Sequence, residues 1–320
     1  MLLLKESTIA NLSTKEKIKY YNSLREYCLS LNKNGNISLG QKLFSKLCPS
    51  LRNYDLEIYG EENIPSNGAF IVCNHSNSHD TFTACEVFTK LDLPVSVFAA
   101  SDDLNFLSNN VFKMMDCTLI DRYNKESCTN GLMELTSKVL NYGNGLIFGE
   151  ATWNLHPYKP MQNLKIGAAR ASAIASKPII PTIFEYYEVP NICSKEKELY
   201  YKCIIKFGKP IMINKDYDLS SQIFEVQKIM ANMRLELWEK IYKEKLDIPK
   251  NADKKVYVNH TYLKKFGGIG FNYDSKEEEK FLYFREGEKR INEYHFDNNG
   301  LFVPGITRKE DKEKVLKLSK

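Results

Sequence analysis

The sequence contains no long apolar run. Hydrophobic residues make up 43% of the 320, yet no uncharged apolar stretch approaches the roughly 18 residues that a membrane-spanning helix needs. The opening Met1-Leu2-Leu3-Leu4 is apolar, but Lys5 and Glu6 interrupt it too early for the core of a secretory signal. We therefore expect any contact with a membrane to be peripheral.

Paired cysteines and a strong charge imbalance are also missing. The 8 cysteines are scattered, with no CxxC pair and no dense framework, which favours a reducing cytosol and a cytoplasmic protein. The 45 basic and 40 acidic side chains give a formal charge of +5. This excess is too small to indicate a nucleic-acid partner, although it suits anionic membranes or phosphorylated substrates.

Strand and helix patterns alternate along most of the chain. Apolar or alternating runs predict strands at residues 54–59, 69–73, 95–99, 118–120, 145–148, 179–184 and 200–207. Helical spacing predicts helices at 14–31, 39–49, 81–90, 126–141, 165–176 and 223–245. The order indicates an α/β fold with a central, mainly parallel or mixed sheet flanked by helices.

Composition divides the chain into three predicted parts. Residues 1–50 form an N-terminal helical segment, and residues 51–249 form the α/β domain. Residues 250–320 are rich in charged and aromatic side chains, and we interpret them as a C-terminal extension of unknown role. Its Gly267-Gly268-Ile269-Gly270 is a lone glycine cluster, which is more typical of a turn than of a phosphate-binding loop.

One short segment carries a definite chemical proposal. The apolar run that ends at Cys73 is followed by Asn74, His75 and, after four further residues, Asp80. Histidine has the near-neutral pKa that a general base needs when a hydroxyl attacks an acyl carbonyl. A carboxylate such as Asp80 would orient the imidazole and stabilise its charged form, and it can also cap the helix that follows.

Other interpretations of this segment are weaker. An isolated histidine at a strand end is more often structural than catalytic, and Cys73, a possible thiol nucleophile, fits core packing better. His75 and His79 with Asp80 suggest a metal site, but the HExxH pattern requires Glu where the chain has Ser76.

Four segments in order resemble the glycerolipid acyltransferase family, the glycerol-3-phosphate and lysophosphatidate acyltransferases. The family's first motif, Asn-His-x4-Asp, is matched at residues 74–80, and its apolar strand ending in Arg at 118–122. Its Phe-Pro-Glu-Gly-Thr-Arg-Ser corresponds to Phe-Gly-Glu-Ala-Thr-Trp-Asn at 148–154. Its Pro-containing strand is matched at 177–182, after a Lys-x-Gly at 165–167. The resemblance covers about residues 54 to 210.

The resemblance implies transfer of a fatty acyl group from acyl-CoA or acyl-carrier protein to a hydroxyl of glycerol-3-phosphate, lysophosphatidate or a related acceptor. His75 would be the general base and Asp80 its partner, with no metal and no cofactor beyond the thioester cosubstrate. The implied substrate-binding residues are Arg122, Glu150, Thr152 and Lys165. The enzyme would act peripherally at the cytosolic face of a membrane.

The altered third motif leaves the acceptor open. Trp153 replaces the family's Arg, which removes one phosphate ligand; Lys165 and Arg170 are candidates to compensate, and a sugar or polyol acceptor is an alternative. Two other functions stay open. One is a non-catalytic lipid- or acyl-carrier-binding protein on the same fold, and the other is a metal-dependent hydrolase that uses His75, His79 and Asp80.

Overall fold

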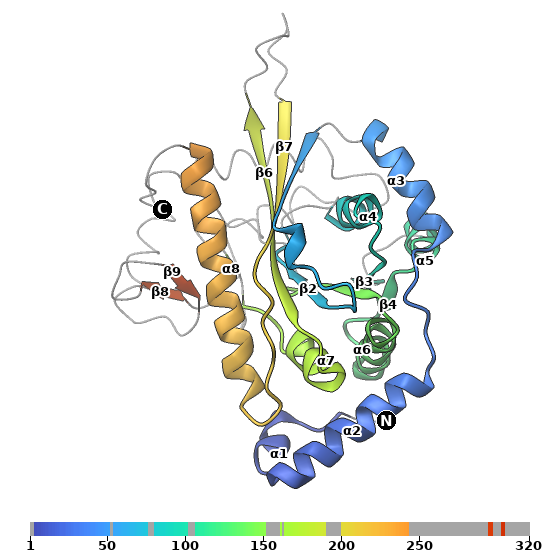
Figure 1. Ribbon diagram of the computed structural model, residues 1–320, viewed down its shortest axis with the longest axis vertical. Coiled ribbons are helices and arrows are strands. Elements are labelled where there is room, and N and C mark those ends of the chain that lie inside the picture. Colours follow the sequence, from blue (N-terminus) through green and yellow to red (C-terminus); the bar gives the residue numbers. More distant parts are fainter. Residues whose placement is uncertain are drawn as a thin grey trace, which may run out of the picture.

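A single mixed sheet forms the centre of the molecule (Figure 1). The structure, a computed structural model, describes residues 3–51, 54–75, 80–101, 106–151, 161, 163–189, 200–242, 294–296 and 302–304. The strands of the sheet are β1 (Tyr54–Tyr59), β2 (Phe70–Cys73), β3 (Val95–Ala100), β4 (Thr118–Ile120), β5 (Asn144–Phe148), β6 (Ile179–Val189) and β7 (Tyr200–Phe207). Their spatial order is β1-β7-β6-β2-β5-β3-β4, which confirms the predicted α/β class.

Helices lie on both faces of the sheet. They are α1 (Glu6–Ala10), α2 (Thr14–Ser30), α3 (Leu39–Leu51), α4 (Asp80–Lys90), α5 (Phe106–Met114), α6 (Lys125–Leu140), α7 (Gly167–Ala175) and α8 (Leu219–Tyr242), with a short 3-10 helix η1 (Glu61–Asn63). In Figure 1, α8 and the pair α3 and α4 lie on opposite sides of the sheet.

The direction of the strands sets where a site can form. Strands β6, β2, β5, β3 and β4 are parallel neighbours, whereas β7 pairs antiparallel with β6 and carries β1 parallel to itself. Parallel strands end at one edge of a sheet, and ligands in open α/β sheets bind at that edge. The segments that follow β2, β4 and β5 therefore meet there.

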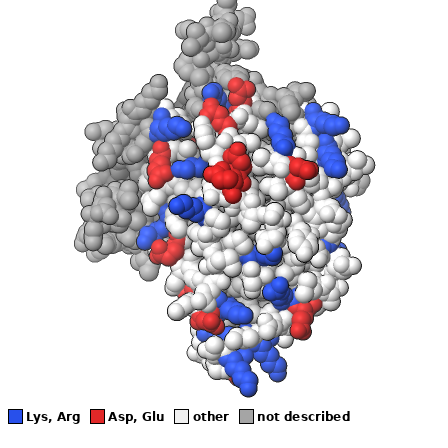
Figure 2. Space-filling view, viewed as in Figure 1, with Lys and Arg blue, Asp and Glu red and all other residues white. Residues whose placement is uncertain are grey.

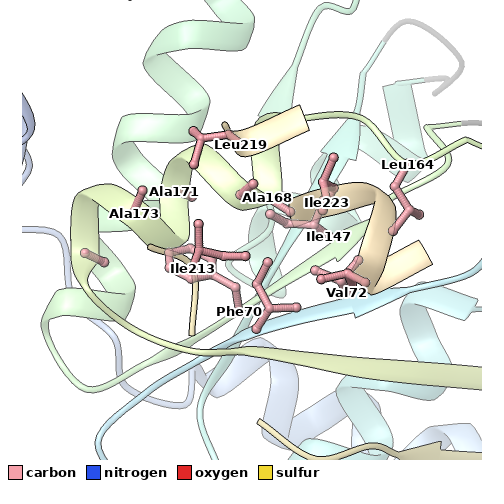
Figure 3. Packing of buried hydrophobic residues seen from close by; sticks show 14 of the residues in the cluster. Phe70, Val72, Ile147, Leu164, Ala168, Ala171, Ala173, Ile213, Leu219 and Ile223 are labelled. Carbon is pink, nitrogen blue, oxygen red and sulfur yellow. The ribbon is translucent and has the colours of Figure 1, made fainter. Parts of the chain in front are cut away.

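The central strands are apolar because both their faces are covered. Alternate side chains of a strand point to opposite faces. Phe70 and Val72 of β2 join the core beneath α6, α7 and α8, part of which is drawn in Figure 3, while Ile71 and Cys73 join the core beneath α4 and α5. Every residue of β2 and β5 is buried. Such strands show continuous apolar runs rather than alternation.

Helix α2 packs against other helices of the protein. Ser13 and Glu16 form a capping box at its start, with the Ser13 N–H donating to Glu16 Oε2 at 2.8 Å. Its apolar side chains Tyr21, Leu24 and Cys28 are buried against α6 and α7. Figure 1 shows α2 lying beneath these two helices. The side of α2 that carries Tyr21, Leu24 and Cys28 is thus an internal packing surface.

Strand β6 is longer than predicted. It continues past Phe184 to Val189, through Glu185, whose Oε2 accepts a 2.7 Å hydrogen bond from Arg234 Nε of α8. Both side chains are only 1% exposed, and the guanidinium lies 5.2 Å from the ring centroid of Trp238. The buried strand can continue through the charged Glu185 because Arg234 of α8 neutralises its charge.

Two helices and the C-terminal hairpin were not predicted. The helices are α1 and α5; the hairpin joins β8 (Tyr294–Phe296) to β9 (Phe302–Pro304), and β9 lies beside α8. The rest of residues 250–320 lies outside the described residues, so the division of the chain into three parts stays a prediction.

Replacing Arg234 by Met should lower the free energy of unfolding by about 3–5 kcal/mol, because Glu185 would be left charged and buried. Urea denaturation of the purified chain measures this. Adding Glu185→Leu should restore most of the loss. Lys206→Gln, which removes the more exposed pair with Glu236, should cost no more than about 1 kcal/mol. If Arg234→Met lowered the free energy of unfolding as little as Lys206→Gln does, the buried pair would not be a determinant of stability.

Candidate active site

Asn74 determines how β2 ends. Its Nδ2 donates to the Phe184 carbonyl at 2.9 Å, and its Oδ1 accepts from the Phe184 N–H at 2.8 Å. The amide therefore makes the two bonds to β6 that backbone groups make in a ladder. Asn74 is fully buried, so these bonds also satisfy polar groups that water cannot reach. The backbone can then turn away from the sheet at His75.

His75 and Asp80 form the contact that the motif predicts. His75 Nδ1 lies 2.9 Å from Asp80 Oδ2, and the Asp80 side chain is fully buried. Asp80 is the first residue of α4, where the positive end of the helix dipole favours a carboxylate. The imidazole stacks on the Phe148 ring, with centroids 4.3 Å apart and planes inclined by 20°. The imidazole is thus oriented both by a carboxylate and by an aromatic face.

Glu150 fixes the backbone of His75. Its Oε2 accepts from the His75 N–H at 2.8 Å, and the residue is 2% exposed. Glu150 follows β5, the neighbour of β2 on the side opposite β6. Sequence reasoning missed this role, and its predicted contact with substrate stays a prediction.

Arg122 lies at the same edge of the sheet. It follows β4, and its Nη1 donates to the Ala151 carbonyl at 3.3 Å. Lys165 reaches the end of β5 through its backbone, whose N–H donates to the Gly149 carbonyl at 2.8 Å, while its side chain is exposed. The structure therefore brings His75, Glu150 and Arg122, which follow β2, β5 and β4, to the same edge of the sheet as Asp80 at the start of α4.

The remaining predicted contributors are Thr152, Trp153 and Arg170. Thr152 and Trp153 lie outside the described residues. Arg170, a candidate substitute phosphate ligand, donates from Nε to Glu6 Oε1 of α1 at 2.6 Å. Its charge is thus paired with an acidic side chain of the N-terminal segment.

Two altered positions of the third motif, 149 and 151, have restrictive surroundings. Ala151, where the family pattern has Gly, has a φ of 57°, in the left-handed region that favours glycine. At Gly149, where the pattern has Pro, an added Cβ would lie 2.7 Å from Leu164 Cδ2 and 3.0 Å from Val72 Cγ1. Leu164 therefore occupies the space that a larger residue at position 149 would need.

The structure bears on the thiol alternative at Cys73 but does not test the metal alternative. Burial, and after it the charge of Asp80, raise the pKa of the Cys73 thiol well above its usual value, which fits the core-packing interpretation. Within the described ranges, no three His, Cys, Asp or Glu side chains form a group able to hold a metal ion. His79 lies outside those ranges, so the metal hypothesis is not tested.

Ala151→Gly should raise the free energy of unfolding by about 1 kcal/mol, because glycine adopts a positive φ without steric cost. Thermal or urea denaturation measures the change. Ala173→Gly, in the interior of α7, is the matched control and should lose about 1 kcal/mol or more. A loss of stability in Ala151→Gly would contradict the strain inferred at this position.

Comparison with known proteins agrees with the motifs. Residues 55–185 match the family model described as Acyltransferase, and no curated protein gives a significant match. A similar solved structure is the 1-acyl-sn-glycerophosphate (LPA) acyltransferase PlsC from Thermotoga maritima, at 16% identity and a TM-score of 0.42, covering 73% of this chain and 87% of that one. The family match includes all four motifs. Residues 55–185 thus match an acyltransferase family model, which agrees with the family and the enzyme class that the sequence indicated.

Proposed function

We propose that the enzyme transfers a fatty acyl group from acyl-CoA or acyl-carrier protein to a hydroxyl of glycerol-3-phosphate, lysophosphatidate or a related acceptor. The observation that carries the proposal is the 2.9 Å contact between His75 Nδ1 and the buried Asp80 carboxylate. With Nδ1–H donating to Asp80, the imidazole presents Nε2 as a base. Such a dyad suits deprotonation of a hydroxyl.

In the proposed reaction, Nε2 takes the proton of the acceptor hydroxyl as its oxygen attacks the thioester carbonyl carbon. A new C–O bond forms, the C–S bond breaks, and the thiolate leaves with the proton that the imidazolium returns. Asp80 stabilises the imidazolium between these steps. Acceptor and thioester react directly, so the proposal includes no acyl-enzyme.

The acceptor side of the site is proposed to use Arg122 for a phosphate. A guanidinium matches phosphate oxygens in a bidentate manner, and the contact with Ala151 holds Arg122 beside the β5 end. Thr152 and Lys165 are proposed to add further polar contacts, and Glu150 to bound the pocket on the side of His75.

We also propose that the enzyme acts peripherally at the cytosolic face of a membrane. No helix in the described part of the chain has both the length and the apolarity to cross a bilayer. Acyl chains and lysophosphatidate partition into lipid, so a surface-bound enzyme would meet them at the interface.

His75→Ala should lower thiol release from acyl-CoA by about 10²–10⁴-fold in the presence of either glycerol-3-phosphate or lysophosphatidate, because the general base is lost. A thiol-reactive dye follows the reaction. Cys73→Ala is the control for a thiol mechanism and should retain turnover. If His75→Ala released thiol at an undiminished rate, His75 could not be the general base. No turnover by the wild-type enzyme with any donor or acceptor would favour the non-catalytic alternative.

A further inference from the structure

Two adjacent helices carry a row of exposed apolar side chains. On α3, Leu39, Leu43 and Leu47 are 79%, 51% and 49% exposed, and their spacing of four places them on one side of the helix. On α5, Leu107 and Met114 are 67% and 57% exposed. Single exposed leucines are common, but a continuous group of large ones marks an interaction site.

The two helices form one continuous surface. Ser38 Oγ, beside the start of α3, donates to the Met114 carbonyl at 3.1 Å. A Cβ at Gly40 would overlap this same carbonyl, so glycine allows α3 to approach the end of α5 closely. The start of α3 therefore lies beside the end of α5, and we call the two exposed sides together the α3–α5 face.

The opposite side of α3 packs against α4, the helix that begins at Asp80. Gln41 donates to the Val95 carbonyl, and the Phe44 ring stacks on Phe82 of α4, with centroids 5.7 Å apart. Phe82 in turn meets Phe112 of α5 edge-on at 5.6 Å. Because Phe82 is two residues from Asp80, these contacts hold the α3–α5 face near the His75–Asp80 dyad. They also fix α3 with its leucines outward.

The charges of this face are all of one sign. Lys42, Lys46 and Lys113 are exposed, and neither α3 nor α5 contains Asp or Glu. Blue side chains lie along the edge that α3 occupies in the view of Figure 1, and red side chains lie further in (Figure 2). Apolar side chains bordered by lysines, without acids, are typical of helices that lie in the headgroup region of an anionic membrane.

We propose that the α3–α5 face docks on an anionic lipid bilayer. The leucines and Met114 enter the boundary between headgroups and acyl chains, and the lysines contact lipid phosphates while their stems cover apolar surface. This inference deepens the proposed peripheral association and rests on it. Helix α2 is not part of the proposed contact, because its side chains Tyr21, Leu24 and Cys28 are buried in the core. The dyad would then lie close to lipid-borne substrates.

Co-sedimentation of the full chain with vesicles tests the proposal. The probes are vesicles of phosphatidylcholine alone and of phosphatidylcholine mixed with phosphatidylglycerol. The wild type should bind the mixed vesicles more tightly. The Leu39→Ser/Leu43→Ser/Leu47→Ser variant should bind them at least ~10-fold more weakly. Lys42→Gln/Lys46→Gln should lose the preference for the anionic vesicles, also by ~10-fold.

Matched variants distinguish docking through this face from lipid binding elsewhere on the protein. Ile18→Ser/Leu29→Ser changes exposed apolar residues of α2 and should bind as the wild type does. His75→Ala should also bind normally, so failure of docking and failure of acyl transfer are distinguishable. The proposal is overturned if the triple serine variant, with an unchanged melting temperature, binds vesicles like the wild type. It is overturned too if that variant abolishes self-association, which would make a second copy the occupant.

Discussion

The site depends on how strand β2 ends. Asn74 makes the last two hydrogen bonds to β6 with its side chain, so the backbone is free to leave the ladder one residue before the imidazole. The N–H of His75 then finds its acceptor on the other neighbour of β2, in Glu150. Because β2 lies between β6 and β5, Phe184 of β6 and Glu150 after β5 can both hold the segment that follows it. The start of α4 then supplies Asp80, which completes the dyad.

The first turn of α4 connects the His75–Asp80 pair to the surface. Asp80 faces the imidazole, whereas Phe82 packs between Phe44 and Phe112 and thereby holds α3 and α5. One helix start thus orients the proposed base and supports the face proposed to meet lipid. This arrangement would fix the distance between the bilayer surface and the reacting groups, which suits an enzyme whose donor chain or acceptor is dissolved in lipid.

The buried strands could be predicted from the sequence, whereas the failures have two causes: contacts between residues far apart in the chain, and apolar side chains on an exposed helix side. The buried strands β2 and β5 were predictable because continuous apolar runs indicate strands covered on both faces. Glu185 made β6 seem to end early, since its partner Arg234 lies 49 residues further along. The bond from His75 to Glu150 joins residues 75 apart, which no local pattern encodes. Helix α5 was missed because Leu107 and Met114 place apolar residues on its exposed side.

If Asp80 makes His75 a base, the Asp80→Asn variant should lose activity while it stays folded. An amide of nearly the same shape preserves packing but favours the wrong tautomer of the imidazole. The measurement is the acceptor-dependent rate of thiol release from acyl-CoA, with the melting temperature as a check on folding. We expect this rate to fall by about 10²–10⁴-fold in a folded protein. A rate within about twofold of the wild type would contradict it, because a dyad mechanism cannot tolerate loss of the orienting carboxylate.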